Sequence, residues 1–316
     1  MPEQPSLSLL IPVYNNERTI QALADRIRRS LDGWDFEVIL VNDGSRDGSL
    51  AALRQLAAGD ARFKVISFSR NFGQHPAIAA GLDHASGDVC VLMDADLEDQ
   101  PEHIPGLVAA LGAGGADIVY TTKGGAGVSA RNMTSDLYHK AFSTSVGVTL
   151  PRDLGTFRVF TRKVRDALRQ FPERHVLYGP LMFYVGFAHA IVPVERGERS
   201  GPSSYSFAKR MRLAVNSLVT YSDLPPKLFA ATGTIMVLAA FAYSALVLVQ
   251  YLVFGQRLPQ GLTILVLLLT GLGGMIMFAI GVLGVYIFRI FQEVLARPRY
   301  LVDETLNLGS TIDGRT

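Results

Sequence analysis

The sequence predicts a doubly wound, mostly parallel α/β domain followed by a basic amphipathic helix and two transmembrane helices. Three observations carry this prediction. Short apolar runs alternate with helical stretches, polar residues follow the ends of several runs, and two long uncharged stretches lie near the C-terminus. Hydrophobic residues make up 49% of the 316 residues and charged residues only 18%, which is below the roughly 25% of an average soluble domain.

The α/β prediction depends on how the apolar runs are spaced. The predicted strands are Leu7–Ile11, Phe36–Val41, Phe63–Phe68, Val89–Met93 and Ile118–Thr121. The predicted helices between and after them cover residues 16–31, 47–58, 74–85 and 101–112. Continuous apolar strands separated by helices are typical of a parallel sheet that is buried on both faces. Because such sheets bind ligands beyond the carboxyl ends of their strands, we expect the chemistry there.

Two stretches, Leu228–Phe254 and Gly261–Phe288, contain no charged residue. A bilayer core of about 30 Å requires roughly 20 apolar residues in a helix, so each stretch is long enough to span. We therefore expect a transmembrane hairpin over residues 227–290, with spans at about 227–254 and 261–288. The alternative is a pair of buried core helices, but those seldom run this long without a polar face.

The charges around the hairpin predict its orientation. The connector Gly255–Gln260 carries one charge, whereas lysines and arginines gather on the other side of both spans. The positive-inside bias places both termini and the domain of residues 1–205 in the cytoplasm, with a cytoplasmic tail at 291–316. Residues 206–223 have a basic amphipathic pattern, which predicts a helix in the headgroup layer. The alternative for that segment is a surface helix packed on the domain.

Several classes of protein are disfavoured by composition and pattern. A formal net charge of +2 argues against nucleic acid as a partner. The single cysteine, Cys90, excludes an intrachain disulfide. No G-x-G-x-x-G spacing follows the first strand, so the dinucleotide-binding interpretation is weak.

The sharpest chemical signal is the pair of carboxylates Asp94 and Asp96, which follows a buried strand. In extended geometry residues i and i+2 share a face, so both side chains can point at one cation. Carboxylate oxygens suit Mg²⁺ or Mn²⁺, which would bridge to a diphosphate. The alternative is that Asp96 only caps the helix near Pro101. That would leave Asp94 unexplained at the end of an apolar strand, where an unpaired charge is costly.

Two other strand ends carry polar residues. The first strand ends in PVYNNE (residues 12–17) and the second in NDGS (residues 42–45). These side chains suit hydrogen bonding to a base and a ribose. Each motif by itself is equally compatible with a turn followed by a helix cap.

Four blocks in this order carry a resemblance to a known family: PVYNNE, VNDGSRDGS, SRNFGQHPAIAAGLDHASGD and MDADLEDQP. They resemble glycosyltransferase family 2, which has the GT-A fold. Within it the chain is most similar to the polyprenyl-phosphate glycosyltransferases, which include bactoprenol glucosyltransferases, dolichyl-phosphate mannose synthases and undecaprenyl-phosphate formamido-arabinose transferases. The two uncharged stretches and LARPRYLV (residues 295–302) also match this subgroup, so the resemblance covers nearly the whole chain.

The resemblance implies a set of roles for matching residues. The residues implied to bind the nucleotide sugar are Pro12, Val13, Tyr14, Glu17, Asn42, Asp43, Arg70 and Asp94. The residues implied in catalysis are Asp94, Asp96 and Arg158, with Asp94 and Asp96 holding the Mg²⁺ or Mn²⁺. The residues implied to hold the acceptor phosphate are Arg131, Arg199, Ser203, Tyr205, Ser206 and Lys209. A homo-oligomer, specifically a tetramer, is also implied.

The chain departs from the family pattern at two positions. Thr156 precedes Phe157-Arg158 where relatives often have D-F-R, and Ser204 replaces a lysine in S-K-Y-S. The missing carboxylate does not exclude activity, because the formamido-arabinose transferases lack it too. A phosphate monoester has a second pKa near 6 and is anionic at neutral pH, so as a nucleophile it needs no general base.

Together these features predict an inverting, metal-dependent transferase. It would move a sugar from a UDP-linked donor to undecaprenyl phosphate at the cytoplasmic face of the bacterial inner membrane, for modification of cell-envelope glycans or lipids. One alternative is a transferase to a sugar hydroxyl in polysaccharide synthesis, which would need a base. The other is an inactive membrane scaffold that retains the nucleotide-binding fold, against which the intact Asp94-Ala95-Asp96 speaks.

Overall fold

The computed structural model describes residues 4–123, 154–171, 177–195 and 261–308, together with positions 235, 238, 242, 249, 252 and 253. The chain divides into two compact units. The first comprises Met1–Arg210 and Pro298–Thr316, and the second comprises Met211–Arg297. The three polar motifs that follow the first, second and fourth strands all lie in the first unit.

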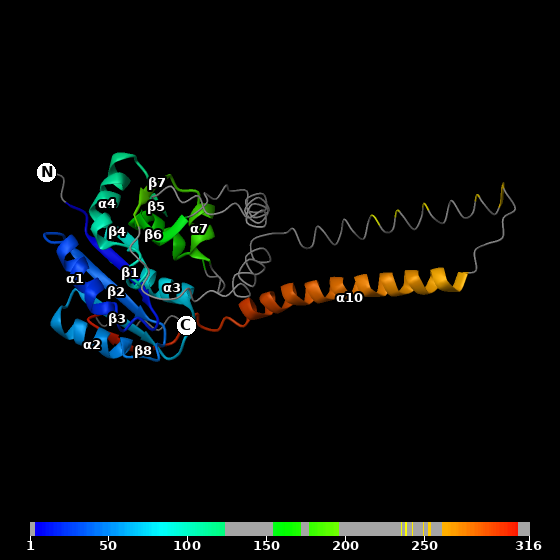
Figure 1. The fold of residues 1–316 in the computed structure, drawn as a ribbon, viewed down its shortest axis with the longest axis horizontal. Helices are drawn as coiled ribbons and strands as arrows, with labels where there is room; N and C mark the ends of the chain where they lie inside the picture. The colour runs from blue at the N-terminus through cyan, green and yellow to red at the C-terminus, as the bar shows by residue number, and fades with distance from the viewer. Residues whose placement is uncertain are drawn as a thin grey trace. The chain divides into compact units, whose positions relative to one another are not determined.

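The first unit contains a mixed sheet of eight strands in the order β7-β5-β6-β4-β1-β2-β3-β8 (Figure 1). The strands are β1 Leu7–Val13, β2 Phe36–Asn42, β3 Phe63–Phe68, β4 Val89–Leu92, β5 Ile118–Lys123, β6 Leu154–Thr161, β7 His189–Val194 and β8 Val302–Leu306. β1 pairs in parallel with β2 and β4, β2 with β3, and β5 with β7. β6 is antiparallel to β4 and β5, and β8 is antiparallel to β3. The predicted mostly parallel sheet is therefore confirmed, with two antiparallel strands added.

Helices cover both faces of the sheet. Among the described residues of this unit, the helices are α1 Ile20–Ser30, α2 Ser49–Gly59, α3 Gln74–His84, the 3-10 turn η1 Pro101–His103, α4 Ile104–Ala113, α6 Arg162–Leu168 and α7 Tyr178–Tyr184. Successive strand side chains point to opposite faces, so Leu9 belongs to the core cluster that includes residues of α1, α2 and α4, and Leu10 belongs to the cluster that includes residues of α3, α6 and α7. This two-sided burial explains why the central strands are apolar without alternation.

The predicted helix at 16–31 begins later than expected, at Ile20. Asn15 has a positive φ of 55°, and the Asn16 side chain accepts the N–H of Tyr14 at 3.0 Å. This local bond holds the chain in a turn, which delays the helix and leaves Tyr14 and Asn16 at the carboxyl edge of the sheet.

The segment at 291–316 is not simply a tail, because Val302–Leu306 forms the edge strand β8. Arg54 makes a bidentate ion pair with Glu304, with the shorter contact at 2.6 Å. Tyr300 stacks on Phe68 with ring centroids 4.8 Å apart. The sequence VDETL has no apolar run to signal a strand. This segment becomes a strand because it pairs with the edge of β3.

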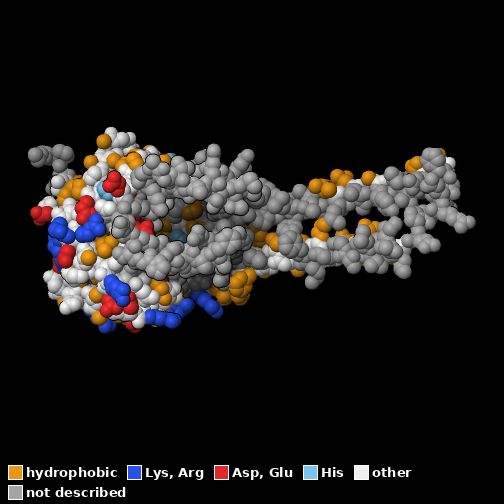
Figure 2. All heavy atoms as spheres, in the orientation of Figure 1, with side chains coloured by type: hydrophobic (Ala, Val, Ile, Leu, Met, Phe, Trp, Pro, Cys, Tyr) orange, Lys and Arg blue, Asp and Glu red, His pale blue; other side chains and the backbone are white. Residues whose placement is uncertain are grey.

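The second unit contains the helix α10, Gly261–Val294. Most of its described side chains are hydrophobic and exposed, as Figure 2 shows in orange. Over the positions that the structure describes, no helix is long and apolar enough to cross a membrane. The predicted amphipathic helix and nearly all of the predicted first span fall outside the described residues.

Candidate active site

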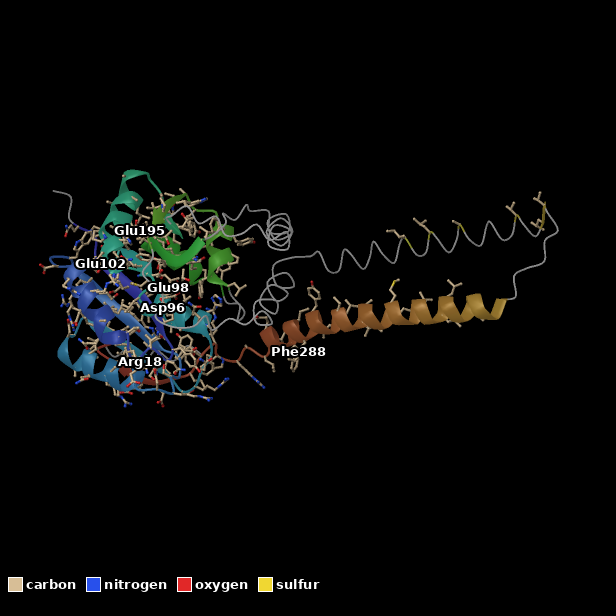
Figure 3. The ribbon with its side chains drawn as sticks, in the orientation of Figure 1. Arg18, Asp96, Glu98, Glu102, Glu195 and Phe288 are labelled. Carbon is tan, nitrogen blue, oxygen red and sulfur yellow. The ribbon has the colours of Figure 1, made fainter. Side chains whose placement is uncertain are left out.

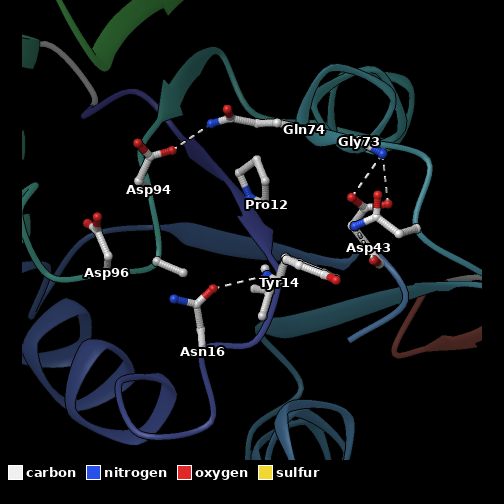
Figure 4. Close-up of a pocket in the computed structure, with 11 residues that line it drawn as sticks. Pro12, Tyr14, Asn16, Asp43, Gly73, Gln74, Asp94 and Asp96 are labelled. Carbon is white, nitrogen blue, oxygen red and sulfur yellow. Dashed lines mark hydrogen bonds between the residues drawn. The ribbon is translucent and has the colours of Figure 1, made fainter. Parts of the chain in front are cut away.

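A cavity of about 590 Å³ opens at the carboxyl ends of β1, β2, β3 and β4. This edge includes the switch in strand order between β1 and β4, where ligands of doubly wound sheets bind. The lining residues are Pro12, Val13, Tyr14, Asn16, Asp43, Asn71, Gly73, Gln74, Asp94, Ala95 and Asp96. Asp94 and Asp96 lie on one side of the cavity and Asp43 lies on the other, with Pro12 and Tyr14 between them (Figure 4).

Asp43 is buried and holds the loop that connects β3 to α3. Its Oδ1 accepts the Phe72 N–H at 2.6 Å, and its Oδ2 accepts the Gly73 N–H at 2.9 Å. Burial raises the pKa of the Asp43 carboxyl, and the two N–H donors act in the opposite direction. The Asp43 carboxylate therefore lines the cavity and also holds the β3–α3 loop in place through these two hydrogen bonds.

The residue after Asp43 can only be glycine without rearrangement. Gly44 has a φ of 61°, and a Cβ there would lie 2.4 Å from the carbonyl carbon of Arg70. The chain after β2 therefore packs directly on the backbone of the β3–α3 loop. This close approach explains the glycine of the NDGS motif and brings the two polar loops together.

Asp94 and Asp96 lie on the segment after β4, and both carboxylates are partly exposed. The Asp94 carboxylate accepts a hydrogen bond from Gln74 Nε2 at 2.9 Å. Asp96 Oδ1 accepts the N–H of Glu98 at 3.1 Å, so Asp96 closes a local turn. The 3-10 turn at Pro101 has Gln100 at its N-cap position, without a side-chain cap. The alternative that Asp96 caps this helix is therefore wrong.

Three of the sequence-predicted binding residues do not line the cavity. Asn42 is buried and donates to Ser67 Oγ at 2.9 Å. Glu17 accepts the N–H of Gly48, just before α2, at 3.1 Å. The Arg70 guanidinium lies over the Phe72 ring, 4.2 Å from its centroid. In this structure each of the three supports a loop next to the cavity.

Arg158 lies in β6 and is buried. Its guanidinium donates to the carbonyl oxygens of Gly155 and Thr156 at 2.9 and 3.1 Å and lies over the Tyr120 ring. Burial lowers its pKa, while the field of Tyr120, Asp94 and Asp99 raises it. Arg158 is absent from the cavity lining.

Sequence reasoning missed part of the lining. Asn71 and Gly73 come from the β3–α3 loop, Gln74 is the first residue of α3, and Asn16 and Ala95 adjoin predicted residues. The loop could have been found from topology alone, because it follows the carboxyl end of a strand adjacent to β2. The residues implied to hold the acceptor phosphate all lie outside the described residues: Arg131, Arg199, Ser203, Tyr205, Ser206 and Lys209.

The donor set fits a divalent cation that shares its coordination with a ligand. Among the residues described, no group of three or more His, Cys, Asp or Glu side chains could hold a metal ion. Mg²⁺ typically takes one or two carboxylates plus phosphate oxygens and water, and Asp94 and Asp96 on one wall supply two carboxylates. The arrangement suits a cation that bridges protein and diphosphate.

Comparison with known proteins places this site in a family. The family model for glycosyl transferase family 2 matches residues 8–169. A bactoprenol glucosyl transferase derived from prophage SfII of Shigella flexneri is 33% identical over 304 residues, which cover 95% of this chain and 98% of the relative. An uncharacterized glycosyltransferase of Bacillus subtilis is 33% identical over 306 residues, with coverage of 95% and 94%.

Among solved structures, the chain resembles glucosyl-3-phosphoglycerate synthase from Mycobacterium tuberculosis in complex with Mn²⁺, UDP-glucose and phosphoglyceric acid. The TM-score is 0.51 at 25% sequence identity, and the match covers 69% of this chain and 79% of that chain. The fold and the cavity thus define a GT-A-like glycosyltransferase. The chain belongs to glycosyltransferase family 2.

Proposed function

We propose that this glycosyltransferase moves a sugar from a nucleotide sugar to a polyprenyl phosphate, with inversion at the anomeric carbon. The proposal rests on the cavity at the carboxyl edge, in which Asp94 and Asp96 lie on one wall and Asp43 on the other. The relative from Shigella flexneri, named as a bactoprenol glucosyl transferase, supports the lipid acceptor. The synthase from Mycobacterium tuberculosis, solved with UDP-glucose, supports a UDP-linked donor.

The donor's base and ribose would occupy the side of the cavity formed by Tyr14, Asp43 and the β3–α3 loop. Tyr14 is 44% exposed, which leaves its ring available for stacking. The Asn71 side chain donates to the Asp43 carbonyl oxygen at 3.2 Å, so this wall is fixed before the donor arrives. A preformed wall lowers the ordering cost of binding.

The diphosphate would lie against Asp94 and Asp96, which would hold Mg²⁺ or Mn²⁺. When bound, this cation would offset the negative charge on the departing nucleoside diphosphate. Gln74 holds the Asp94 carboxylate through its amide at 2.9 Å. The buried Arg158 would add positive potential at Asp94 without lining the cavity.

The acceptor chemistry requires positioning more than proton transfer. A phosphate oxygen of the lipid attacks the anomeric carbon, the new C–O bond forms, and the bond to the diphosphate breaks with its electron pair leaving on the nucleoside diphosphate. The attacking oxygen is already anionic near neutral pH, so the reaction needs no general base. This is consistent with Thr156 at the position where relatives often have an aspartate. We assign the acceptor phosphate to Arg131, Arg199, Ser203, Tyr205, Ser206 and Lys209.

We further propose that the enzyme works at the cytoplasmic face of the bacterial inner membrane. The uncharged stretches at 228–254 and 261–288, and the flanking basic residues of the sequence, support attachment there. The proposed organisation is a catalytic domain (1–205), an interfacial helix (206–223), a transmembrane hairpin (227–290) and a C-terminal segment (291–316). Extraction of cell membranes with alkaline carbonate tests it, and release of the chain into the supernatant would contradict it.

A transfer assay tests the proposed reaction. Purified full-length protein is incubated with Mn²⁺, a panel of UDP- and GDP-sugars, and one of three acceptors: undecaprenyl phosphate, phosphoglyceric acid or an oligosaccharide. Mass spectrometry is expected to show the sugar on the lipid phosphate alone. Transfer only to phosphoglyceric acid or to a sugar hydroxyl would contradict the proposal, as would release of free sugar in every reaction.

A further inference from the structure

The segment between β4 and η1 is folded back on itself by hydrogen bonds between side chains and the backbone. Asp99 Oδ2 accepts the N–H of Asp94 at 3.0 Å. Thr19 Oγ1 donates to the Ala95 carbonyl oxygen at 2.7 Å. With the turn closed by Asp96 on Glu98, these bonds define the backbone that carries both carboxylates. Figure 3 shows Asp96 and Glu98 next to each other in the middle of the domain.

The fold-back requires an uncommon backbone conformation at Leu97. Its φ is 69°, in the left-handed region, which costs a residue with a Cβ about 1–2 kcal/mol. Such a conformation persists only where the surrounding contacts determine it. The turn at Leu97 is what lets Asp99 reach back over the loop to Asp94.

Asp99 is a buried residue that contacts a residue of the cavity lining, Asp94, without lining the cavity itself. It is only 3% exposed. Arg158, also buried, feels the negative field of Asp94 and Asp99, which raises its pKa against the effect of burial. Asp99 is therefore held inside the domain, beside the residue that carries the donor-facing carboxylate.

We propose that Asp99 is a positioning residue for the cation and diphosphate: by holding the Asp94 N–H, it fixes the peptide from which the Asp94 carboxylate projects. This inference rests on the proposed function, because it assumes that Asp94 meets the cation. Loss of a partner behind a metal ligand typically lowers metal affinity ten- to a hundredfold. The effect of Asp99 should therefore appear in metal-dependent binding and leave metal-independent binding intact.

The test compares Asp99→Ala with wild type in two binding measurements on the full-length protein. Electron paramagnetic resonance of free Mn²⁺ reports cation binding in the presence of UDP, and calorimetry with chelator reports binding of UDP alone. For Asp99→Ala, we expect Mn²⁺ affinity to fall by roughly ten- to a hundredfold, with UDP affinity in chelator changed less than about twofold. Asp99→Asn, whose amide oxygen can accept the Asp94 N–H, is expected to recover most of the loss.

Asp60→Ala is the matched control. Asp60 also closes a loop, by accepting the Arg62 N–H at 3.1 Å, but it precedes β3, at the opposite end of that strand from the cavity. This variant is expected to lose stability while retaining wild-type affinity for both Mn²⁺ and UDP. A merely structural role for Asp99 would make the two variants behave alike.

Several outcomes would overturn the proposal. A folded Asp99→Ala protein with wild-type Mn²⁺ affinity would do so, and so would a folded Asp99→Asn protein as weak as Asp99→Ala. Should Asp99→Ala fail to fold, Asp99→Glu, which displaces the carboxylate by one methylene, must show the selective loss instead. A wild-type protein that binds neither Mn²⁺·UDP nor Mn²⁺·GDP would overturn the proposed function itself, and this role of Asp99 with it.

Discussion

The charge of Asp96 can be separated from its structural role by comparing two substitutions. Asp96 Oδ1 closes a turn on the Glu98 N–H at 3.1 Å, and the carboxylate also lines the cavity. Asp96→Asn keeps an oxygen that can accept the N–H and removes only the charge. Asp96→Ala removes both.

The two variants should therefore differ in stability and agree in activity. Loss of one ordinary hydrogen bond costs about 1 kcal/mol, so Asp96→Ala should be destabilised by about that amount and Asp96→Asn by less than about 0.5 kcal/mol. Removing one of two carboxylates from a shared cation site should cost about 3 kcal/mol of transition-state stabilisation. That corresponds to a fall in kcat/KM of roughly a hundredfold or more in both variants.

The assay is sugar transfer to undecaprenyl phosphate at varied Mn²⁺, with chemical denaturation in parallel. Asp88→Asn is the control, because Asp88 lies before β4, at its amino end, and bonds Ser6; its activity should match wild type. Wild-type activity should vanish in excess chelator. Near wild-type kcat/KM for Asp96→Asn, or full transfer in chelator, would refute the metal assignment.

Three further predictions concern the fold and the reaction. Burial raises the pKa of Glu37, but bonds from Lys64 and two serines outweigh it and hold the pKa below its usual value. Its contribution to stability is therefore present at neutral pH and lost as pH falls below about 4.5. Denaturation should show Glu37→Gln less stable by about 1.5–3 kcal/mol at pH 7, a gap that narrows as the pH falls below about 4.5; a gap constant with pH would contradict this. Gly44→Ala puts a Cβ 2.4 Å from the Arg70 carbonyl carbon and should lower stability by about 1–3 kcal/mol and weaken UDP binding in calorimetry, so an unchanged Tm would count against the loop packing. Thr156→Asp should change the transfer rate by far less than the 10²–10⁴-fold typical of a general base, and a gain of that size would show that a base is needed.

The central half of the fold could be predicted from sequence because its strands are buried on both faces. Short, largely apolar runs such as Phe36–Val41 and Val89–Met93 are typical of buried strands, and the structure confirms them within two residues. The strands β6, β7 and β8 were not predicted. β7 contains Pro193, and β8 is largely polar. Both depend on pairing with strands distant in the sequence, which local pattern does not reveal.

The positions of the site residues at the strand ends could be predicted from the topology of the sheet. The orientations of their side chains could not, because they depend on hydrogen-bond partners. Strand ends of a parallel sheet share one edge, so Asp43, Asp94 and Asp96 could be brought together from the sequence. The orientations of Asn42 and Glu17 are set by bonds to Ser67 and Gly48, which no sequence spacing specifies. Asp99 was missed for the same reason: its role depends on the left-handed turn at Leu97.

Photolabelling tests most directly whether the donor occupies the cavity at the carboxyl edge. A UDP-glucose analogue with an azide on the uracil ring is irradiated with the full-length protein and Mn²⁺, and labelled peptides are mapped by mass spectrometry. The label is expected within residues 12–16, 43–47 or 71–74, which surround the side of the cavity assigned to the base. Excess UDP-glucose should remove it. Labelling that competes with UDP-glucose but maps to α6, α7 or β7 would contradict the account.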